Sequence, residues 1–269
     1  MSAAPEYVRL IGDCTPERSP WTIAEVYHPR ILDNVKSYLK RGDKEPTLLG
    51  IQSAAFRYFK KAMHVMMHSE KASGKTTAMV IRIITITLIV IACMDNHAAE
   101  ESTQRSTSRM PFALILAPTE ELCNKLKEMV QYLTVGLNSH LIKVVSVCKP
   151  TGPLMLLDGG TDIIIGTPEM VAYLDGHGCI DWTYLSFLGL DRVDDLMAPD
   201  HKEHIEKLLH PESGTISRGT QVGYTLISTS SKMTPELRSH ILQNYTGAQH
   251  GYETCELSVE SVEVIKNTV

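Results

Sequence analysis

The chain has 269 residues, of which 43% are hydrophobic and 21% are charged. This length and composition allow a full hydrophobic core, which excludes global disorder and leaves room for one large domain or two small ones. The formal net charge is −5, so the chain lacks the overall basic excess of a dedicated nucleic-acid binder, and any nucleic-acid site must be a local patch.

The chain begins with residues 1–20, which contain three prolines and little periodicity and predict an irregular lead-in. Helices are then predicted over 29–40, 52–61, 119–133, 168–174, 201–209 and 234–243. Short apolar runs predict strands over 62–68, 112–117, 142–147, 162–165, 185–190 and 222–227. Continuous apolar strands that alternate with helices are typical of an α/β fold, a mostly parallel sheet with helices on both faces.

Three other segments complete this description of the chain. Residues 78–94 are nearly all apolar or Thr, but the run is short for a bilayer and contains Arg82, so we predict a buried helix and no membrane span. Residues 95–110 are polar and predict a mobile surface loop. Residues 251–269 alternate like a β-strand and predict either an edge strand or a linker that leaves the domain.

The six cysteines are scattered along the chain. They form no Cys-x-x-Cys pair, and no His cluster stands at metal-ligand spacing. We therefore expect a reduced intracellular protein without structural zinc.

The segment from Ser69 to Thr76 reads SEKASGKT and lies between a predicted strand and a predicted helix. In a P-loop, backbone N–H groups at a helix N-terminus bind phosphate, the Lys neutralises it and the following hydroxyl binds Mg²⁺. Gly74-Lys75-Thr76 supplies this core, although the strict pattern has Gly in place of Ser69. Lys71 is either an extra phosphate ligand or a solvated surface lysine.

About 115 residues after Thr76, Asp191 follows directly on the predicted strand 185–190. A carboxylate at a strand end beside a P-loop is suited to hold Mg²⁺, usually through water. We therefore predict that Thr76 and Asp191 form the metal site of a nucleotide-binding domain.

The order of these motifs resembles the first RecA-like domain of the DEAD-box RNA helicases over residues 21–250. Six segments carry the resemblance: Gln52 for the Q motif, Ser73 to Thr76 for motif I, Pro118 to Leu122 for motif Ia, Thr167 to Met170 for motif Ib, Asp191 to Asp194 for Asp-Glu-Ala-Asp, and Ser228-Thr229-Ser230 for motif III. A P-loop kinase or GTPase is a weaker alternative, because such enzymes do not need the Pro-Thr and Thr-Pro segments in this order.

The resemblance implies a RecA-like P-loop fold, ATP with Mg²⁺ as ligand, and RNA as a backbone-bound partner. It assigns nucleotide contacts, including adenine recognition by Gln52, to Gln52, Ser73, Gly74, Lys75 and Thr76. It assigns RNA contacts to Pro118, Thr119, Thr167 and Pro168.

The sequence also departs from the family pattern. Arg192 replaces the Glu that positions the attacking water, and losing such a base typically costs about 10²–10⁴-fold in rate. Glu120 and Glu169 stand where cations are expected near RNA phosphates. The spacing ahead of Gln52 is two residues longer than usual, and the double-Gly motif has its nearest candidate at Thr151-Gly152.

Two functions stay open from the sequence: a domain of an ATP-dependent RNA helicase, and a pseudo-helicase scaffold that binds protein partners without turnover. The predicted organisation is a lead-in (1–20), one RecA-like domain (21–250) and a C-terminal extension or linker (251–269). The resemblance further implies a second RecA-like domain if the native chain is longer, protein partners in an RNP, and a cytoplasmic location, in RNP granules. The divergent motifs are also similar to helicase-like segments of Tudor-domain proteins of the piRNA pathway.

Overall fold

The computed structural model describes residues 10–11, 31–40, 48–59, 63–101, 110–137, 142–149, 160–220, 223–245, 254–258 and 262–265. Its strands are β1 (Leu10–Ile11), β2 (His64–His68), β3 (Ala113–Leu116), β4 (Val144–Val147), β5 (Ile163–Gly166), β6 (Phe187–Leu190), β7 (Thr225–Ser230), β8 (Thr254–Ser258) and β9 (Val262–Ile265). Its helices are α2 (Leu32–Leu39), α3 (Gly50–Phe59), α4 (Lys75–Glu101), α5 (Glu120–Leu133), α7 (Pro168–Gly176), α8 (Val193–Leu196), α9 (Pro199–Leu209), α10 (Thr215–Gly219) and α11 (Pro235–Asn244).

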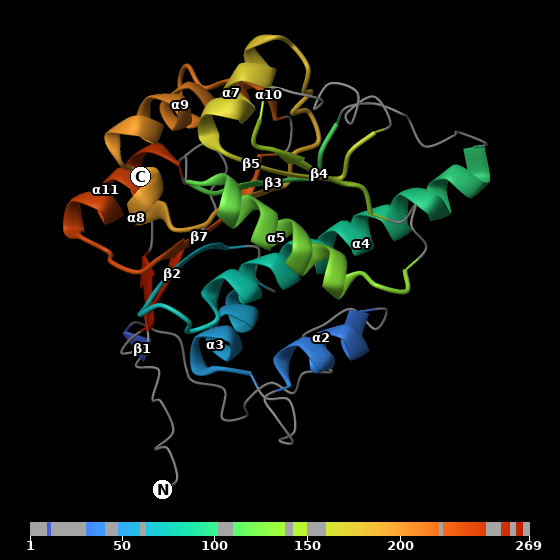
Figure 1. Ribbon diagram of the computed structural model, residues 1–269, viewed down its shortest axis with the longest axis horizontal. Helices are drawn as coiled ribbons and strands as arrows, with labels where there is room; N and C mark the ends of the chain where they lie inside the picture. Colours follow the sequence, from blue (N-terminus) through green and yellow to red (C-terminus); the bar gives the residue numbers. More distant parts are fainter. Residues whose placement is uncertain are drawn as a thin grey trace, which may run out of the picture.

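The strands form one sheet in the order β1-β9-β8-β2-β7-β6-β3-β5-β4 (Figure 1). Every pair is parallel except β8 with β9. The predicted mostly parallel sheet with helices on both faces is therefore confirmed. Because β2, β7 and β6 are neighbours and run in the same direction, the segments that follow them meet at one edge of the sheet.

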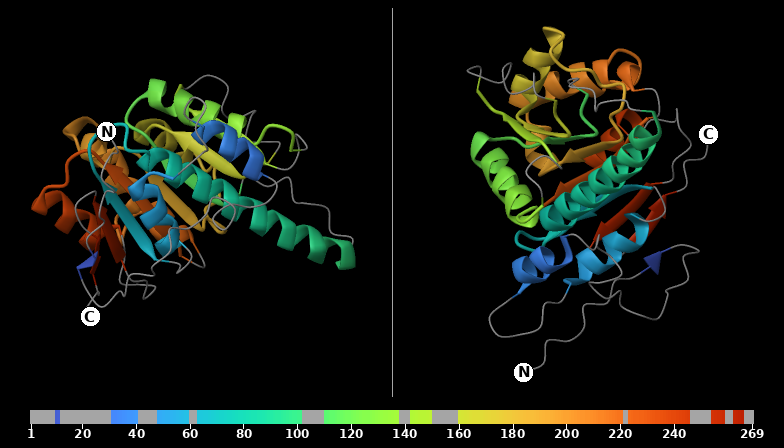
Figure 2. Two further views of the ribbon diagram at one scale, coloured as in Figure 1. Left: turned by 90° about the horizontal axis from the view of Figure 1, so that it is seen from below. Right: turned by 90° about the vertical axis from the view of Figure 1, so that its right-hand side faces the viewer.

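Side chains along each central strand alternate between two hydrophobic clusters. In β3, Ala113 and Ile115 join the cluster under α2, α3, α4 and α5, whereas Leu114 and Leu116 join the cluster under α7, α9 and α11. Figure 2 shows these two helical layers on opposite sides of the sheet. Since both faces are covered, every position of the strand is buried, which explains the continuous apolar runs in the sequence.

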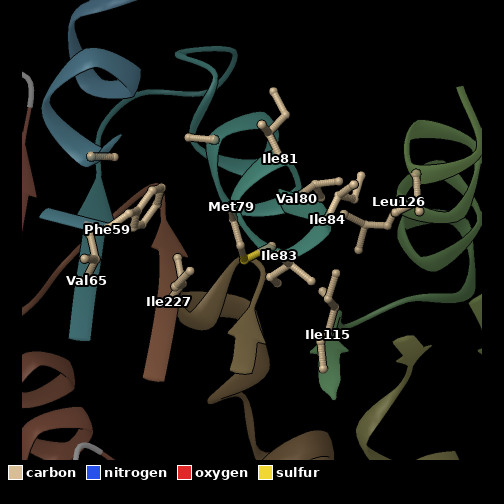
Figure 3. Packing of buried hydrophobic residues seen from close by; sticks show 14 of the residues in the cluster. Phe59, Val65, Met79, Val80, Ile81, Ile83, Ile84, Ile115, Leu126 and Ile227 are labelled. Carbon is tan, nitrogen blue, oxygen red and sulfur yellow. The ribbon is translucent and has the colours of Figure 1, made fainter. Parts of the chain in front are cut away.

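The apolar segment 78–94 lies within α4, which crosses the sheet above β2, β7 and β3 (Figure 3). Met79 and Ile83 point from this helix toward Ile227 and Ile115. Arg82 is accommodated because a guanidinium nitrogen donates to the carbonyl oxygen of Phe59 at 2.5 Å, and burial lowers the pKa of Arg82 to about 10. Within the described residues, no helix combines the length and apolarity that crossing a membrane requires.

The prediction of a surface loop over residues 95–110 is wrong in its first part. The helix α4 continues to Glu101, and its distal end extends away from the other elements in Figure 1. The segment Ala98-Ala99-Glu100-Glu101 consists of strong helix formers without Gly or Pro, so it prolongs a helix that already exists although it offers no apolar face. Residues 102–109 lie outside the described part of the chain.

The ends of the chain differ in how far the structure describes them. Of the lead-in predicted as irregular over 1–20, the structure describes only residues 10–11, which form the strand β1. The other residues up to 30 lie outside the described part, as do the segments 41–47 and 150–159, which hold the Pro-Thr spacing ahead of Gln52 and Thr151-Gly152. In the described part of residues 251–269, namely 254–258 and 262–265, the chain forms two strands: β8 pairs with β2 and with β9, and β9 pairs also with β1. Strands are therefore present as one alternative predicted, but they lie within the sheet and not at its edge. The helices α8 and α10 were not predicted, because single turns are too short to give a periodic signal.

Gly166 at the end of β5 is a specific packing requirement of the sheet. A Cβ at this position would lie 2.5 Å from Val147 Cγ2, 2.7 Å from Val171 Cγ2 and 2.8 Å from the Val147 carbonyl oxygen. We expect Gly166→Ala to lower the free energy of unfolding by about 1–3 kcal/mol, as overpacking does elsewhere. Urea denaturation measures this change.

Gly176→Ala is the matched control, because a Cβ there meets no atom within 4 Å. Its stability should stay within about 0.5 kcal/mol of the wild type. If the two variants were equally stable, β4 and α7 would be able to move away from a side chain at position 166 without loss of stability, which would contradict the expected effect of overpacking.

Candidate functional site

The site is built where β2, β7 and β6 end. The segment 69–74 leaves β2 and leads into α4, Asp191 follows β6, and Ser231 follows β7. The Ser69 N–H donates to the carbonyl oxygen of Ser230 at 3.3 Å, which ties the first segment to the end of β7. The sheet order thus brings together three segments that are far apart in the sequence.

The segment 69–74 needs two residues with positive φ, Ala72 at 65° and Gly74 at 87°. Glycine adopts this conformation freely, whereas for alanine it costs roughly 1–2 kcal/mol. A Cβ at Gly74 would also lie 2.5 Å from Gln52 Nε2. The chain therefore retains glycine at the position where space and conformation both demand it, and tolerates strain at the exposed Ala72.

Lys75, the first residue of α4, is 8% exposed, and its ammonium group is enclosed by oxygens of the preceding segment. Nζ donates to the carbonyl oxygens of Ser69 at 2.7 Å and Glu70 at 2.8 Å, and to the hydroxyls of Ser69 at 3.1 Å and Ser73 at 3.0 Å. Burial lowers the pKa of Lys75, and the charges of Asp191 and Asp194 act against this effect. These hydrogen-bond partners are neutral oxygens that an anionic ligand can replace.

Asp191 is 2% exposed and accepts two hydrogen bonds on the same carboxylate oxygen. The hydroxyl of Thr76 on α4 and the hydroxyl of Thr229 on β7 each donate to Oδ1 at 2.7 Å. Burial raises the pKa of Asp191, while the hydrogen bonds from Thr76 and Thr229 lower it. The predicted pair of Thr76 and Asp191 is thus in direct contact.

Arg192 follows with a left-handed backbone, φ 58° and ψ 58°. Its N–H donates to Thr229 Oγ1 at 3.0 Å, and its guanidinium lies 2.6 Å from Asp195 Oδ2. Asp194 instead binds the segment after β7, because its Oδ2 accepts from the Ser231 hydroxyl at 2.6 Å. Hydrogen bonds from Arg192 to Thr229 and from Ser231 to Asp194 therefore connect the segment after β6 with β7 and the residue that follows it.

Motif III contributes mainly buried groups. Ser228, Thr229 and Ser230 are at most 2% exposed on β7. The Ser230 hydroxyl donates to the carbonyl oxygen of Lys232, so it shapes the segment that Asp194 binds. Within this motif, Thr229 is the residue that touches Asp191.

A pocket of about 270 Å³ opens beside this segment and is lined by Tyr38, Leu39, Leu49, Gln52, Ala72, Ser73, Gly74, Lys75, Thr76 and Thr77. Gln52 is buried there: its Oε1 accepts from the Leu49 N–H at 2.9 Å and its Nε2 donates to the Gly74 carbonyl oxygen at 3.2 Å. Both ends of this amide are engaged, so its predicted contact with adenine requires an exchange of partners.

Sequence reasoning missed the wall of this pocket that Tyr38 and Leu39 form. Both lie at the end of α2, in a segment whose apolar spacing predicted only a helix. Tyr38 is 36% exposed in the structure, but nothing in the sequence of this segment distinguishes it from an ordinary surface tyrosine. Because α2 and the segment 69–74 are far apart in the sequence, no local sequence pattern predicts that they line the same pocket.

The four residues predicted to bind RNA lie at the ends of the neighbouring strands β3 and β5. Thr119 is exposed and caps α5, whereas Pro118, Thr167 and Pro168 are buried. The structure therefore brings these four positions together, but only Thr119 among them is exposed to a ligand at this edge.

Two glutamates occupy the exposed part of the same edge. Glu120 pairs with Lys149 at 2.8 Å, and Glu169 lies 3.7 Å from His201. The lysine at this edge is thus already paired with an acidic side chain, which lowers the positive potential available to a polyanion.

The described residues fit a nucleoside triphosphate with a divalent cation. Lys75 supplies a phosphate cation, the N-terminus of the 27-residue helix α4 supplies backbone N–H groups, and Thr76 with Asp191 supplies oxygen ligands. The fit is poorer for hydrolysis. Arg192 cannot accept a proton from water, since a guanidinium carries donors only.

Comparisons with known proteins agree with this geometry. The sequence model of the DEAD/DEAH box helicase family matches residues 50–229. A curated relative, the DEAD-box ATP-dependent RNA helicase 41 of Arabidopsis thaliana, is 28% identical over 71% of this chain, and the chain spans only 36% of that protein.

Solved structures have the same fold. The yeast DEAD-box splicing factor Prp28 superposes with a TM-score of 0.67 at 19% identity, over 94% of this chain and 53% of the other. A DEAD box protein from Methanococcus jannaschii gives 0.63 at 17% identity, over 87% and 54%. At these identities the likeness concerns the fold, so the predicted RecA-like architecture is confirmed.

The buried Asp191 carboxylate predicts a stability effect. The pKa of Asp191 is higher in the folded protein than in the unfolded chain, so ionisation of this carboxyl lowers the free energy of unfolding. This loss of stability is absent at low pH and complete above the folded pKa. We expect Asp191→Asn, measured without Mg²⁺, to melt at a higher temperature than the wild type at neutral pH, and this gap to close as the pH falls through the range where Asp191 protonates.

Asp195→Asn is the control, because Asp195 is 45% exposed and its ion pair with Arg192 lies at the surface. We expect its melting temperature to follow that of the wild type at each pH. A lower melting temperature for Asp191→Asn at neutral pH would contradict the dominance of desolvation at this carboxylate.

Proposed function

Because this chain belongs to the DEAD/DEAH box helicase family, we propose that it is the first RecA-like domain of an ATP-dependent RNA helicase in which ATP hydrolysis is weak or lost. The domain binds ATP with Mg²⁺, contacts RNA weakly, and acts in RNA binding or RNP assembly. The single observation that carries the proposal is the buried Lys75, enclosed by oxygens of the segment 69–74, beside the contact between Thr76 and Asp191.

Nucleotide binding is supported by what Lys75 contacts in the free protein. Two backbone carbonyl oxygens and two hydroxyls surround its ammonium group. Phosphate oxygens carry negative charge and make stronger hydrogen bonds to an ammonium than neutral oxygens do. A triphosphate is therefore favoured to replace them, with the first turn of α4 donating N–H groups.

Bound Mg²⁺ would neutralise phosphate charge and help to orient the triphosphate. Thr76 and Asp191 are the residues that would hold it, directly or through water. In the free protein the Thr76 hydroxyl donates to the Asp191 carboxylate, so both oxygens already face the same point. The raised pKa of Asp191 means that a cation at this point also stabilises its ionised form.

Hydrolysis is disfavoured by Arg192. Its side chain pairs with Asp195 at 2.6 Å and offers no acceptor for a water proton. Without a general base, a rate loss of about 10²–10⁴-fold is expected. In the family, the second RecA-like domain closes the ATP cleft, so if the native chain is longer, such a domain is the expected partner of this one.

The alternative is a pseudo-helicase scaffold that binds protein partners without nucleotide turnover. It is favoured by the engagement of both ends of the Gln52 amide, with Leu49 and Gly74, together with the loss of a base at Arg192. If these contacts are not exchanged, the pocket keeps its own partners and rejects adenine.

The wider setting is proposed from the resemblance alone. Protein partners in an RNP and a cytoplasmic location, in RNP granules, follow from it, and a place in the piRNA pathway beside a Tudor domain is the narrowest form of the same expectation. The relatives named above bear on the helicase family and not on this subgroup.

Lys75→Ala tests nucleotide binding most simply. We expect it to abolish ATP–Mg²⁺ binding in calorimetry, because removing one partner of a buried charge pair costs about 2–5 kcal/mol. Lys71→Ala is the matched control from the same segment: its side chain is exposed, and we expect unchanged affinity. Unchanged affinity of Lys75→Ala would exclude a P-loop function, and no binding by the wild type would favour the scaffold.

The acidic edge predicts weak RNA binding. We expect single-stranded RNA to bind the wild type with a shallow salt dependence, and Glu120→Arg and Glu169→Arg each to raise the affinity. Each additional RNA phosphate that a variant neutralises should steepen the logarithmic salt slope by about 0.7. Fluorescence anisotropy at several salt concentrations measures both quantities.

Glu203→Arg on α9 controls for the change in net charge alone, because Glu203 is 75% exposed and pairs with Lys207 on its own helix. An equal increase in affinity for this variant would show that RNA responds to total charge and does not prefer the edge formed by β3 and β5.

A further inference from the structure

A buried carboxylate on β8 lies between two nitrogen groups from other elements. The side chain of Glu256 is 8% exposed, and its Oε1 lies 3.0 Å from Nε2 of His68, the last residue of β2. Its Oε2 lies 2.6 Å from Nε of Arg238 on α11. Because a carboxylate offers acceptors only, Nε2 of His68 carries a hydrogen and donates it to Glu256. Glu256 therefore connects the end of β2 with α11.

The register of the sheet makes this contact possible. The strand β8 pairs in parallel with β2, and Glu256 is aligned with Met66, two residues before His68. Met66 belongs to the cluster under α7, α9 and α11, so by alternation His68 and Glu256 also face α11. A buried ion pair adds little net stability, because the cost of desolvation offsets the attraction. The effect of Glu256 is better sought in the geometry that it fixes.

His68 stands directly before the segment 69–74. The next residue, Ser69, donates its N–H to the carbonyl oxygen of Ser230 at 3.3 Å. Two of the four oxygens that surround the Lys75 ammonium belong to Ser69, the carbonyl oxygen at 2.7 Å and the hydroxyl at 3.1 Å. A displacement of His68 would therefore move half of the groups that hold Lys75.

The second partner of Glu256 acts on the neighbouring segment. Arg238 lies in the first turns of α11, the helix that follows β7. This helix begins shortly after Ser231 and Lys232, whose backbone N–H groups each donate to Asp194 Oδ2 at 3.2 Å. Glu256 thus supports two of the three segments that form the site, the one after β2 and the one after β7.

We infer that Glu256 is a positioning residue of the nucleotide site, which acts through His68 on the segment that encloses Lys75. The inference rests on the proposed nucleotide binding. Glu256 does not itself touch the nucleotide: it holds the end of β2 at the place from which the Ser69 oxygens reach the ammonium. The strand β8, in a part of the chain predicted as an extension or linker, thereby belongs to the support of the site.

Substitutions at His68 test this role, because Glu256 stays paired with Arg238 in each of them. We expect His68→Leu to weaken ATP–Mg²⁺ binding in calorimetry by about 10–100-fold, the loss that is typical when outer groups that orient the ligands of a metal site are removed. His68→Gln should recover most of this loss, because an amide N–H can donate to the carboxylate in place of the ring. A side chain needed only for packing would give the opposite order of affinities.

His177→Leu is the matched control, because it makes the same substitution at an exposed histidine that caps the C-terminus of α7. We expect it to leave ATP–Mg²⁺ affinity unchanged. An equal loss in His177→Leu and His68→Leu would overturn the inference.

A double-mutant cycle shows whether His68 acts through Glu256. Glu256→Met replaces the carboxylate with an apolar side chain of similar length, and we expect an affinity loss similar to that of His68→Leu. The double variant should bind no more weakly than either single variant, because both substitutions remove the same contact. Losses that simply add would show that the two side chains act independently, contrary to the inference.

Hydrogen exchange of the Ser69 N–H in the ligand-free protein gives a second measurement, which needs only the variants at His68. This N–H is bonded to Ser230, and we expect it to exchange faster in His68→Leu than in the wild type and in His68→Gln. Unchanged exchange in His68→Leu would overturn the inference. If the wild type bound no nucleotide, the proposed function would fail, and the exchange rates would still decide whether Glu256 holds this segment through His68.

Discussion

Two threonine hydroxyls converge on one oxygen of Asp191, and the geometry of the site depends on this contact. Thr76 donates from the first turn of α4 and Thr229 from β7, each at 2.7 Å. The carboxylate is buried, so it would be unfavourable without these donors or a cation. The contact joins the helix that follows β2 to the segment that follows β6, and thereby sets where Lys75 and Arg192 stand.

The parallel sheet makes this contact possible. The strands β2, β7 and β6 are adjacent and aligned, so residues more than a hundred positions apart reach the same edge. The same principle brings Thr119 and Thr167 together at the ends of β3 and β5. One edge of the sheet thus carries both the segment 69–74 with Lys75 and a second surface. This edge is the usual place for ligands in open α/β sheets.

Much of this arrangement was predictable because its signals are local. The buried strands, the segment Gly74-Lys75-Thr76 and the strand-end Asp191 each leave a pattern within a few residues, and the fold fixes how they meet. The pocket wall at Tyr38 and the hydrogen bond from Thr229 to Asp191 depend on contacts between distant segments. Such contacts produce no periodic pattern in the sequence. The extension of α4 to Glu101 also lacks an apolar periodicity, because helix propensity alone prolongs the helix there.

The proposed function separates nucleotide binding from hydrolysis, because the site combines groups suited to a phosphate and a cation with a residue that is not suited to activate water. Lys75, Thr76 and Asp191 keep the groups that a triphosphate and its cation need, and Ala72 keeps the backbone conformation at the expense of strain. Arg192 stands where the resemblance places the residue that positions the attacking water, and a guanidinium cannot accept a proton from it. At the neighbouring edge, Glu120 pairs with the lysine that would otherwise attract a polyanion.

The most direct test of this separation is single-turnover hydrolysis of ATP by the wild type and by Arg192→Glu, each in the full-length protein with RNA and Mg²⁺. Arg192→Gln serves as the control, since it removes the cation without supplying a base. The account predicts intact bound ATP in the wild type and the control, and faster hydrolysis in Arg192→Glu. Rapid RNA-stimulated hydrolysis by the wild type would contradict it.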